Sequence, residues 1–565
     1  MRNVRLAPLA LALMFASVSH PLPADAAGST NELAGLWEAK KRFGPDARGP
    51  LVLRRVETAW IADFIGRVIP VREECGLLTF AIPEGALRAR IEKDGIHGHW
   101  TQARTDGSSP VATPVRLQPE GEQRWRGEIA PLEETFTFYL MVSPNGEAFL
   151  RNPERNATIF WNVKRLARDG RAVKLQREDD STVVEGTYDA ERDVLTIAFP
   201  GRGGSYDFKR APDSSAFHPR GKTPARYAYR PPLARDDGWP VATLGDVRID
   251  RAKIEAFMQM LIDLPIDSIH APDIHAVLVS RHGKLVLEEY FHGEHRDKLH
   301  DTRSAAKSVT AILFGAAGID PSLPVYQTLG AEADDPRKRA MKAEHLLTMS
   351  SGFYCDDNDE KAPGREDTMQ EQEEEPNWYR YALRLPMSDT PGVKAVYCST
   401  NPNLLGAVIA KAAGAPQPEL FDRRVARPMQ FGRYAFWLQP TGEPYMGGGM
   451  KILPRDFLKL GQLIVADGVW RGTRVLSREF VARASSPLFQ LGRRKYGYLW
   501  WIDDRPYKDR TVRAVMALGN GGQIVMVVPE LDLVVVFMGG NYSDLVLLRS
   551  KTNKFVPESI LPAGE

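Results

Sequence analysis

The sequence predicts two folds in one chain: an all-β barrel or sandwich, followed by an α+β domain with an antiparallel sheet and a helical region. In residues 27–213, short runs of alternating apolar and polar residues are separated by turns rich in Gly, Asn, Asp and Pro, as expected for strands with one buried face. From residue 246 to residue 565, strand-like runs lie at both ends and helical runs lie between them. This order is typical of α+β domains whose terminal segments meet in one sheet.

Length and composition limit the possible functions. A chain of 565 residues is too long for one ordinary domain, so we expect two or three. A content of 43% hydrophobic and 26% charged residues is typical of globular proteins. The formal net charge of +2 gives no electrostatic reason to expect a nucleic-acid partner or an anionic membrane surface. The oligomeric state is not predicted by any of these features.

Residues 1–26 are predicted to be a signal peptide. Arg2 and Arg5 precede an apolar run, and Ala24-Asp25-Ala26 has the small-x-small pattern of a cleavage site. The alternative is a membrane anchor, but the apolar run is shorter than the roughly 20 residues that a membrane-spanning helix needs. We therefore expect an exported protein, periplasmic or extracellular, with no transmembrane anchor in the mature chain.

The remaining chain divides into further segments by composition. Residues 214–245 are rich in Pro and Arg without clear periodicity, which predicts a linker or an extended wrap. Beyond them, a hairpin is predicted around His282-Gly283, and two apolar helices are predicted to end at Gly318 and Gly414. Four apolar runs between residues 496 and 539 predict consecutive antiparallel strands.

One Ser-x-x-Lys sequence occurs in the chain, with Ser304 and Lys307 at the start of a predicted helix. Residues three apart on a helix share a face, so the lysine amine would lie beside the serine hydroxyl. The helix dipole favours an oxyanion at this end, and burial would lower the pKa of Lys307 so that it could act as a base. The alternative is chance, because the pattern arises about once or twice in a chain of this length.

Two segments farther along the chain could join this serine. Tyr397 follows an extended segment and precedes a helix, so its hydroxyl could relay a proton in a cleft; the alternative is a tyrosine in the core. Gly519 lies in a Gly-rich turn between two apolar strands and would let the backbone lie against a substrate. An N–H just beyond it could complete an oxyanion hole with the Ser304 N–H, although the turn could also be an ordinary one.

In this order, the three segments resemble the serine β-lactamase and penicillin-binding-protein-like superfamily. Its sites combine Ser-x-x-Lys, then Tyr-x-Asn or Ser-Asp-Asn, then Lys-Thr-Gly on a strand. The chain looks most like class C β-lactamase-related hydrolases, family VIII-type esterases and 6-aminohexanoate-dimer hydrolases. The resemblance covers about residues 250–545 and includes EHLLTMSSG (344–352), YCSTNPNLLG (397–406) and GGGMKILPRDFLKLGQLI (447–464). It implies a β-lactamase/transpeptidase-like domain over residues 246–565.

The resemblance also implies a role for each matching residue. Ser304 would be the acylated nucleophile, Lys307 its base or proton relay, and Tyr397 a partner in the proton transfer. The backbone N–H groups of Ser304 and Asn520 would form the oxyanion hole, with Gly519 beside them. No cofactor is implied, and the histidines show no HExxH or clustered ligand spacing, so no metal is predicted either.

Two positions depart from the family pattern. The Asn expected two residues after the tyrosine is Ser399, whose hydroxyl reaches less far toward Lys307 or a substrate amide; Asn401 could substitute for it. The third motif reads Ala517-Leu518-Gly519, without the cation that helps β-lactamases and transpeptidases to bind a substrate carboxylate. Arg513 lies four residues earlier on the same strand, which is too far. These departures favour esterase- or amidase-type members.

The chain has three cysteines, Cys75, Cys355 and Cys398. Cys398 adjoins Tyr397, and Cys355 follows a loop that in this fold runs toward the same cleft, so the resemblance implies a Cys355–Cys398 disulfide with Cys75 left over. The alternative is two buried thiols. The acid-rich run at 355–367 lacks the glycine placement of an EF-hand loop, and no role is predicted for it.

Together these features predict an exported, metal-independent serine hydrolase that cleaves a small-molecule or peptide-like ester or amide through an acyl-enzyme on Ser304. The second candidate is a β-lactamase or D-Ala peptidase that acts on cell-wall-type substrates. Two other classes stay open. One is a catalytically weak protein that binds a peptide or cell-wall fragment, and the other is a chain whose functional half is the N-terminal domain.

Overall fold

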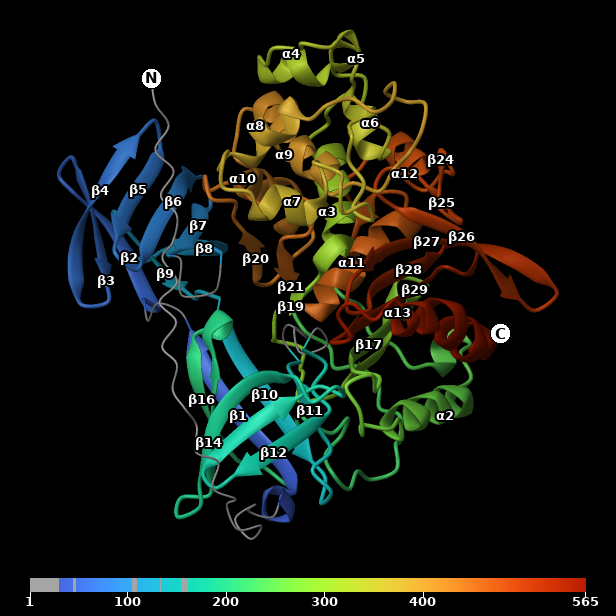
Figure 1. Ribbon diagram of the computed structural model, residues 1–565. Helices are drawn as coiled ribbons and strands as arrows, with labels where there is room; N and C mark the ends of the chain where they lie inside the picture. Colours follow the sequence, from blue (N-terminus) through green and yellow to red (C-terminus); the bar gives the residue numbers. More distant parts are fainter. Residues whose placement is uncertain (1–29, 44–46, 104–108, 133, 154–160, 565) are drawn as a thin grey trace, which may run out of the picture.

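The computed structural model describes residues 30–43, 47–103, 109–132, 134–153 and 161–564 (Figure 1). The predicted signal peptide at 1–26 lies outside these residues. Among the described residues, no helix is both long enough and apolar enough to cross a membrane. The N-terminal strands and the mixed α/β part occupy different regions of the molecule (Figure 1).

The first N-terminal unit is a closed antiparallel barrel. Strand β9 pairs with both β2 and β8, and Gly127 of β9 lies opposite Leu51 on one side and Leu117 on the other. Buried side chains, among them Trp60 and Trp100, fill the interior. Its strands are β2 (Gly49–Val56), β3 (Ala59–Phe64), β4 (Arg67–Glu74), β5 (Leu77–Ile82), β6 (Gly85–Glu92), β7 (Gly95–Gln102), β8 (Val111–Pro119) and β9 (Arg124–Ile129).

The second N-terminal unit is also an antiparallel barrel, and the first is inserted into it after strand β1. Its sheet has the order β11-β10-β1-β16-β15-β14-β13-β12. The two end strands meet, because the Ala148 N–H donates to the Lys164 carbonyl and the Leu166 N–H donates to the Gly146 carbonyl, each at 2.9 Å. Its strands are β1 (Gly35–Phe43), β10 (Glu134–Val142), β11 (Ala148–Arg151), β12 (Arg165–Asp169), β13 (Ala172–Gln176), β14 (Thr182–Asp189), β15 (Val194–Phe199) and β16 (Gly204–Arg210).

The expectation of an all-β barrel or sandwich is therefore confirmed as a barrel architecture. Alternation of apolar and polar residues shows which face of a strand is buried, but not whether the sheet closes. Closure depends on pairings between strands far apart in the sequence, such as β2 with β9 and β1 with β16.

Residues 214–245, predicted to be a linker or an extended wrap, run mostly without regular helix or strand. The segment crosses the C-terminal part of the chain and is fixed to it by hydrogen bonds. The Tyr229 hydroxyl donates to the Val286 carbonyl at 2.8 Å, and the Trp239 indole N–H donates to the Arg455 carbonyl at 3.1 Å.

The C-terminal part is built on an antiparallel sheet of order β18-β17-β29-β28-β27-β26-β25-β24. Val277 of β17 lies opposite Phe537 of β29, which confirms that the two ends of this domain meet in one sheet. The predicted hairpin around His282-Gly283 joins β17 to β18. The strands are β17 (Ile274–Arg281), β18 (Lys284–Tyr290), β24 (Phe489–Leu491), β25 (Arg494–Tyr496), β26 (Trp501–Tyr507), β27 (Arg510–Gly519), β28 (Gln523–Val528) and β29 (Leu533–Gly539).

Both faces of this sheet are covered, which explains its nearly continuous apolar strands. Along β29, Val535 and Phe537 pack with α2 (Arg251–Ile262) and the C-terminal segment η7 (Lys551–Ile560). Val534 and Val536, which alternate with them, pack with the helical region on the other face. The helix α11 (Pro454–Val465) lies directly on that second face.

The helical region centres on two helices that end where the sequence predicts. The helix α3 (Ala306–Ala316) is followed by Gly318, and α9 (Thr400–Ala413) ends at Gly414, both glycines with positive φ. The other helices are α4 (Val325–Leu329), α5 (Pro336–Arg339), α6 (Ala343–Leu347), α7 (Glu366–Glu371), α8 (Trp378–Arg384), α10 (Gln417–Phe421), α12 (Arg478–Ala484) and α13 (Leu545–Ser550).

One sheet continues from the first barrel into the C-terminal part. Strand β8 pairs with β20 (Tyr434–Trp437), β20 with β21 (Met450–Ile452), and β21 with β19 (His300–Asp301). An ion pair between Arg427 and Glu92, at 2.7 Å, also joins the C-terminal part to the first barrel. The separate hairpin of β22 (Val469–Trp470) and β23 (Thr473–Arg474) completes the described strands. The β2–β9 barrel is thus joined through backbone hydrogen bonds to a strand that ends three residues before Ser304.

Candidate active site

Ser304 and Lys307 lie side by side, as their spacing predicts. Residues Arg303–Ala305 form a 3-10 turn, η4, that leads directly into α3. The Lys307 ammonium donates to the Ser304 Oγ at 2.9 Å and to the Gly447 carbonyl at 2.5 Å. Lys307 is buried, whereas Ser304 is half-buried and so remains open to a substrate. Thr302 fixes the turn from below, because its hydroxyl donates to the Met450 carbonyl of β21 at 2.7 Å.

Tyr397 completes the group that the sequence places together. The Lys307 nitrogen lies 5.1 Å from the centre of its ring, and Lys307 and Ser304 both act to lower the pKa of its hydroxyl. The ring stacks on Trp501 of β26, with centroids 5.5 Å apart and planes at 27°. Two segments far apart in the sequence thereby bring a hydroxyl, an ammonium and a phenol together.

The protonation state of Lys307 differs from the expectation. Burial acts to lower the pKa of Lys307, but Tyr397, Glu366 and Asp357 act in the opposite direction and outweigh it, so the pKa lies above its ordinary value. The expectation of a lowered lysine pKa is therefore wrong. Burial also raises the pKa of Tyr397, although Lys307 and Ser304 oppose this effect. At neutral pH the pair is an ammonium beside a phenol.

The Ser399 hydroxyl contacts the Asp357 carboxylate and not the Lys307 ammonium. Its hydroxyl donates to the Asp357 Oδ2 at 2.6 Å, and its backbone N–H donates to the same oxygen at 2.9 Å. The Glu366 N–H donates to the other oxygen, Oδ1, at 3.0 Å. Burial and the nearby Glu366 raise the pKa of Asp357 to about 6, although Lys307 acts against this rise. Ser399 therefore positions an acidic group near Lys307.

Asn401 does not take the place of the missing asparagine. It lies in α9 and is buried, and its amide nitrogen contacts the Met349 sulfur at 3.8 Å. Its side-chain oxygen has no hydrogen-bond partner among the residues that the structure describes. Its amide is thus turned toward the helical region.

Gly519 lies where β27 passes against the nucleophile turn. A Cβ at this position would come within 2.2 Å of the Thr302 carbonyl oxygen and 3.1 Å of the Ala305 nitrogen. Asn520 follows directly, and its side-chain oxygen accepts a hydrogen bond from the Ser543 N–H at 2.5 Å. Only a residue without a side chain lets the strand approach the turn this closely, which brings the Asn520 backbone toward Ser304.

The first position of the third motif carries no charge in the structure. Ala517 is buried in the sheet. Arg513 is exposed near the other end of β27, where its backbone N–H donates to Glu530 at 3.1 Å. The structure therefore agrees that Arg513 lies apart from Ser304.

Four residues near the site were not predicted as functional: Asp357, Glu366, Tyr445 and Gly447. The Tyr445 hydroxyl donates to Glu366 at 2.6 Å. A Cβ on Gly447 would meet the Tyr445 hydroxyl at 2.4 Å and the Ser399 carbonyl at 2.8 Å, so the glycine lets this loop reach Lys307. The acid-rich run at 355–367 and the triple glycine at 447–449 were visible signals, but neither shows from sequence which residues it meets.

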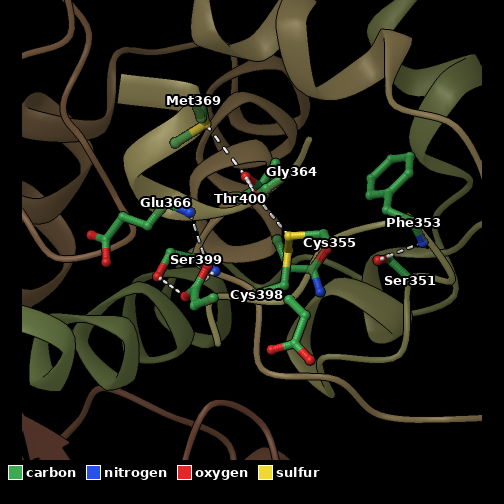
Figure 2. The surroundings of a disulfide bond; sticks show 12 residues. Ser351, Phe353, Cys355, Gly364, Glu366, Met369, Cys398, Ser399 and Thr400 are labelled. Carbon is green, nitrogen blue, oxygen red and sulfur yellow. Dashed lines mark hydrogen bonds between the residues drawn. A yellow bond between two sulfur atoms is a disulfide. The ribbon is translucent and has the colours of Figure 1, made fainter. Parts of the chain in front are cut away.

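The Cys355–Cys398 disulfide is present, with the two Cα atoms 5.6 Å apart (Figure 2). It lies beside Ser399 and Thr400 at the start of α9 (Figure 2). It joins the segment that carries Asp357 to the segment that carries Tyr397. Cys75 is an exposed free thiol, as predicted.

Removal of this disulfide is expected to destabilise the protein. The bond spans a sequence separation of 43, so the double variant Cys355→Ser/Cys398→Ser is expected to lose about 3–4 kcal/mol of unfolding free energy under the chain-entropy model. Urea denaturation measures the loss, with Cys75→Ser as the matched control. Equal stability of the double variant and the control would contradict the expectation.

The comparisons with known proteins concern the part of the chain that carries this site. Residues 270–539 match the protein-family model described as Beta-lactamase. Over 303 residues, the chain is 23% identical to the 6-aminohexanoate-dimer hydrolase of Paenarthrobacter ureafaciens, an alignment that covers 46% of this chain and 75% of the relative.

Solved structures to which the chain is similar include a penicillin-binding protein from Bacillus halodurans, with 17% identity, a TM-score of 0.40, and coverage of 50% of this chain and 95% of that one. Another is EstCE1, a hydrolase with promiscuous acyltransferase activity, with 16% identity, a TM-score of 0.43, and coverage of 55% and 97%. None of these alignments extends over the whole chain. The family match over residues 270–539 and the motifs support a serine hydrolase in the C-terminal part of the chain, which has the predicted antiparallel sheet and helical region.

Proposed function

We propose that this protein is an exported enzyme that cleaves an ester or amide bond through an acyl-enzyme on Ser304. The observation that carries the proposal is the contact of three groups. The Lys307 ammonium lies 2.9 Å from the Ser304 Oγ and 5.1 Å from the centre of the Tyr397 ring. A hydroxyl that accepts from an ammonium and faces a phenol oxygen is arranged to lose its proton during attack.

The direction of the Lys307–Ser304 hydrogen bond supports one route for the proton transfer. Lys307 donates to Ser304, so the serine hydroxyl can give its own proton to the phenolate of Tyr397, the ionised form that the Lys307 ammonium favours, while Oγ attacks the substrate carbonyl carbon. The ammonium of Lys307 then stabilises the serine oxygen and the proton-sharing pair electrostatically. Lys307 acts in this scheme as a fixed cation, and Tyr397 acts as the base.

The same groups complete the reaction. The carbonyl oxygen becomes an oxyanion that the N–H groups of Ser304 and Asn520 would hold. As the tetrahedral intermediate collapses, the bond to the leaving oxygen or nitrogen breaks and Tyr397 returns the proton to that atom. A water then attacks the acyl-enzyme, gives a proton to Tyr397, and releases the acid while Ser304 regains its hydrogen.

The substrate is proposed to be an ester or amide and not a β-lactam. Support comes from Ala517, which stands where β-lactamases and transpeptidases carry a cation on the strand. The relative named 6-aminohexanoate-dimer hydrolase agrees with a small acyl substrate. Cleavage of a β-lactam or a D-Ala peptide is the competing outcome of the experiment below.

Intact-mass measurement after incubation with an ester, an amide and a β-lactam tests the proposal. The wild-type chain is expected to gain the mass of the acyl group from the ester or the amide, and Ser304→Ala is expected to gain none. Ser308→Ala, one turn farther along α3, is the matched control. A folded wild-type protein that forms no adduct and turns over none of the three compounds would favour a binding protein.

The acid limb of the pH profile is expected to depend on Asp357. The ionised carboxylate accepts both the hydroxyl and the backbone N–H of Ser399 and so fixes the segment that carries Tyr397. Because the pKa of Asp357 is about 6, kcat/KM for a neutral ester is expected to fall as pH decreases through about 6. In Asp357→Asn this limb is expected to disappear. If the variant keeps the same limb, another group controls it.

Export is proposed on separate grounds. The N-terminal pattern of Arg2, Arg5 and Ala24-Asp25-Ala26 supports a signal peptide, and disulfides persist in oxidising compartments. Mass spectrometry of the protein from its native host is expected to show a mature N-terminus near Ala27. A full-length N-terminus on a protein that stays in the cytoplasm would contradict export.

A further inference from the structure

We propose that Arg303 binds a carboxylate of the substrate, so that the enzyme prefers esters or amides with an anionic group near the scissile bond. The proposal rests on the proposed acyl transfer at Ser304 and names the class of substrate for it. Four observations carry it: the position of Arg303, the incomplete pairing of its guanidinium, its partial exposure, and the uncharged third motif.

Arg303 directly precedes the nucleophile and has an unusual backbone conformation. Its φ is +48°, in the left-handed region that residues with a Cβ seldom adopt. The conformation is held because the Arg303 N–H donates to the Asp301 Oδ1 at 2.9 Å. A Cβ on Gly448 would lie 3.5 Å from the Arg303 carbonyl carbon, so the triple-glycine loop packs on the other side of this backbone. The backbone of Arg303 is thereby fixed directly before the nucleophile.

The Arg303 guanidinium is held loosely by its own surroundings. Within the described parts of the chain, the nearest carboxylate oxygen is that of Asp301, at 4.0 Å. The Tyr542 ring centre lies 5.6 Å away, and Glu366 attracts the guanidinium while accepting the Tyr445 hydroxyl at 2.6 Å. A guanidinium has five N–H donors in a planar fork, which matches the two oxygens of a carboxylate. Donors therefore remain for a ligand.

The side chain is also accessible, with 38% of its surface exposed. A partly shielded guanidinium binds an anion more strongly than a fully exposed one, because water competes less and the effective dielectric constant is lower. Glu366 acts electrostatically on both Arg303 and Lys307, which places the Arg303 charge in the same acidic surroundings as the reacting lysine.

Two other cations considered for this task, Lys307 and Arg513, do not fit it. Lys307 already donates to Ser304 and to the Gly447 carbonyl. Ala517 is uncharged, and Arg513 lies apart from the nucleophile on β27. An enzyme of this fold that lacks a cation on strand β27 can still bind a substrate carboxylate if the residue before the nucleophile supplies the positive charge. The alternative is that Arg303 only balances Asp301 and Glu366.

Matched pairs of esters test the proposal. One pair is 4-nitrophenyl butyrate and mono-4-nitrophenyl succinate, with the carboxylate on the acyl side. The other is phenyl acetate and 4-acetoxybenzoate, with the carboxylate on the leaving group. For at least one pair, Arg303→Gln is expected to lower the ratio of anionic to neutral kcat/KM by about 10- to 100-fold. Arg303→Lys is expected to lose less, because an ammonium keeps the charge but not the fork.

Two further variants complete the ester experiment: one reverses the charge of Arg303, and the other removes the charge of the distant Arg513. Arg303→Glu is expected to favour the 4-nitrophenyl ester of 6-aminohexanoate, which carries an ammonium, over the succinate ester. Arg513→Gln, on the same sheet, is expected to keep the wild-type ratios. Thermal unfolding of each variant checks that the fold is retained.

The outcomes separate this proposal from the one on which it depends. If the Arg303 variants lose activity equally on both members of each pair while Ser304 still forms an adduct, Arg303 has only a structural role and the carboxylate proposal fails alone. If wild-type protein forms no adduct with any of these esters, the acyl-transfer proposal fails, and the carboxylate proposal with it.

Discussion

Lys307→Met is expected to reduce kcat/KM by at least about 1,000-fold, because it removes the only ammonium that donates to Ser304 among the described residues. Methionine has a similar length and no charge, so the variant tests the cation more than the packing. Without Lys307, the Tyr397 phenol loses the neighbour that lowers its pKa and becomes harder to ionise. The steady-state kinetics of a neutral ester measure the loss.

The losses of kcat/KM caused by changing Lys307 and by changing Tyr397 are expected not to be additive. Because the two residues serve one proton transfer, Lys307→Met combined with Tyr397→Phe is expected to cost little more than either change alone. Lys459→Met is the matched control, since Lys459 is also a buried lysine and is paired with Asp456 at 2.8 Å in α11. It is expected to lower stability but not the activity of the folded protein. Additive losses at Lys307 and Tyr397 would contradict the shared role.

Gly519→Ala is expected to lower kcat/KM by about 100-fold and to destabilise the fold by about 1–3 kcal/mol. The added methyl group would lie 2.2 Å from the Thr302 carbonyl oxygen, which is backbone and cannot rotate away. The strand and the nucleophile turn must therefore separate, and this moves the Asn520 N–H away from the position of the oxyanion. Ester kinetics and urea denaturation measure the two effects.

Gly201→Ala is the matched control for this change. A Cβ at Gly201 has nothing within 4 Å, and the residue lies in the second barrel region far from Ser304 in the sequence. Gly201→Ala is expected to change neither kcat/KM nor the free energy of unfolding measurably. If Gly519→Ala retained full activity, the close approach of β27 to the turn would have no part in catalysis.

The sequence predicts those features that depend on local spacing. Ser304 and Lys307 are three residues apart, and that spacing alone brings their side chains together. The apolar strands at 274–290 and 496–539 follow from periodicity, and the helix ends follow from Gly318 and Gly414. The order of the segments then indicates the family, which supplies Tyr397.

Features that depend on distant contacts were not predictable in the same way. Ser399 has its partner Asp357 in another loop, so its hydrogen bonds could not be seen from the motif. The direction of the Lys307 pKa shift depends on Glu366 and Asp357, which meet it only in the fold. The closure of each barrel depends likewise on pairings between the first and last strands of long segments.

The shared sheet has a consequence for any attempt to divide this protein. In a fragment that begins near residue 246, β20 would lose its partner β8 and present unpaired N–H and C=O groups to solvent. Exposed edges of this kind pair with other chains and promote aggregation. The β2–β9 barrel therefore covers the edge of the hydrolase domain. If the isolated domain aggregated or lost activity, the first explanation would be its exposed β20 edge, and not the loss of a substrate-binding module.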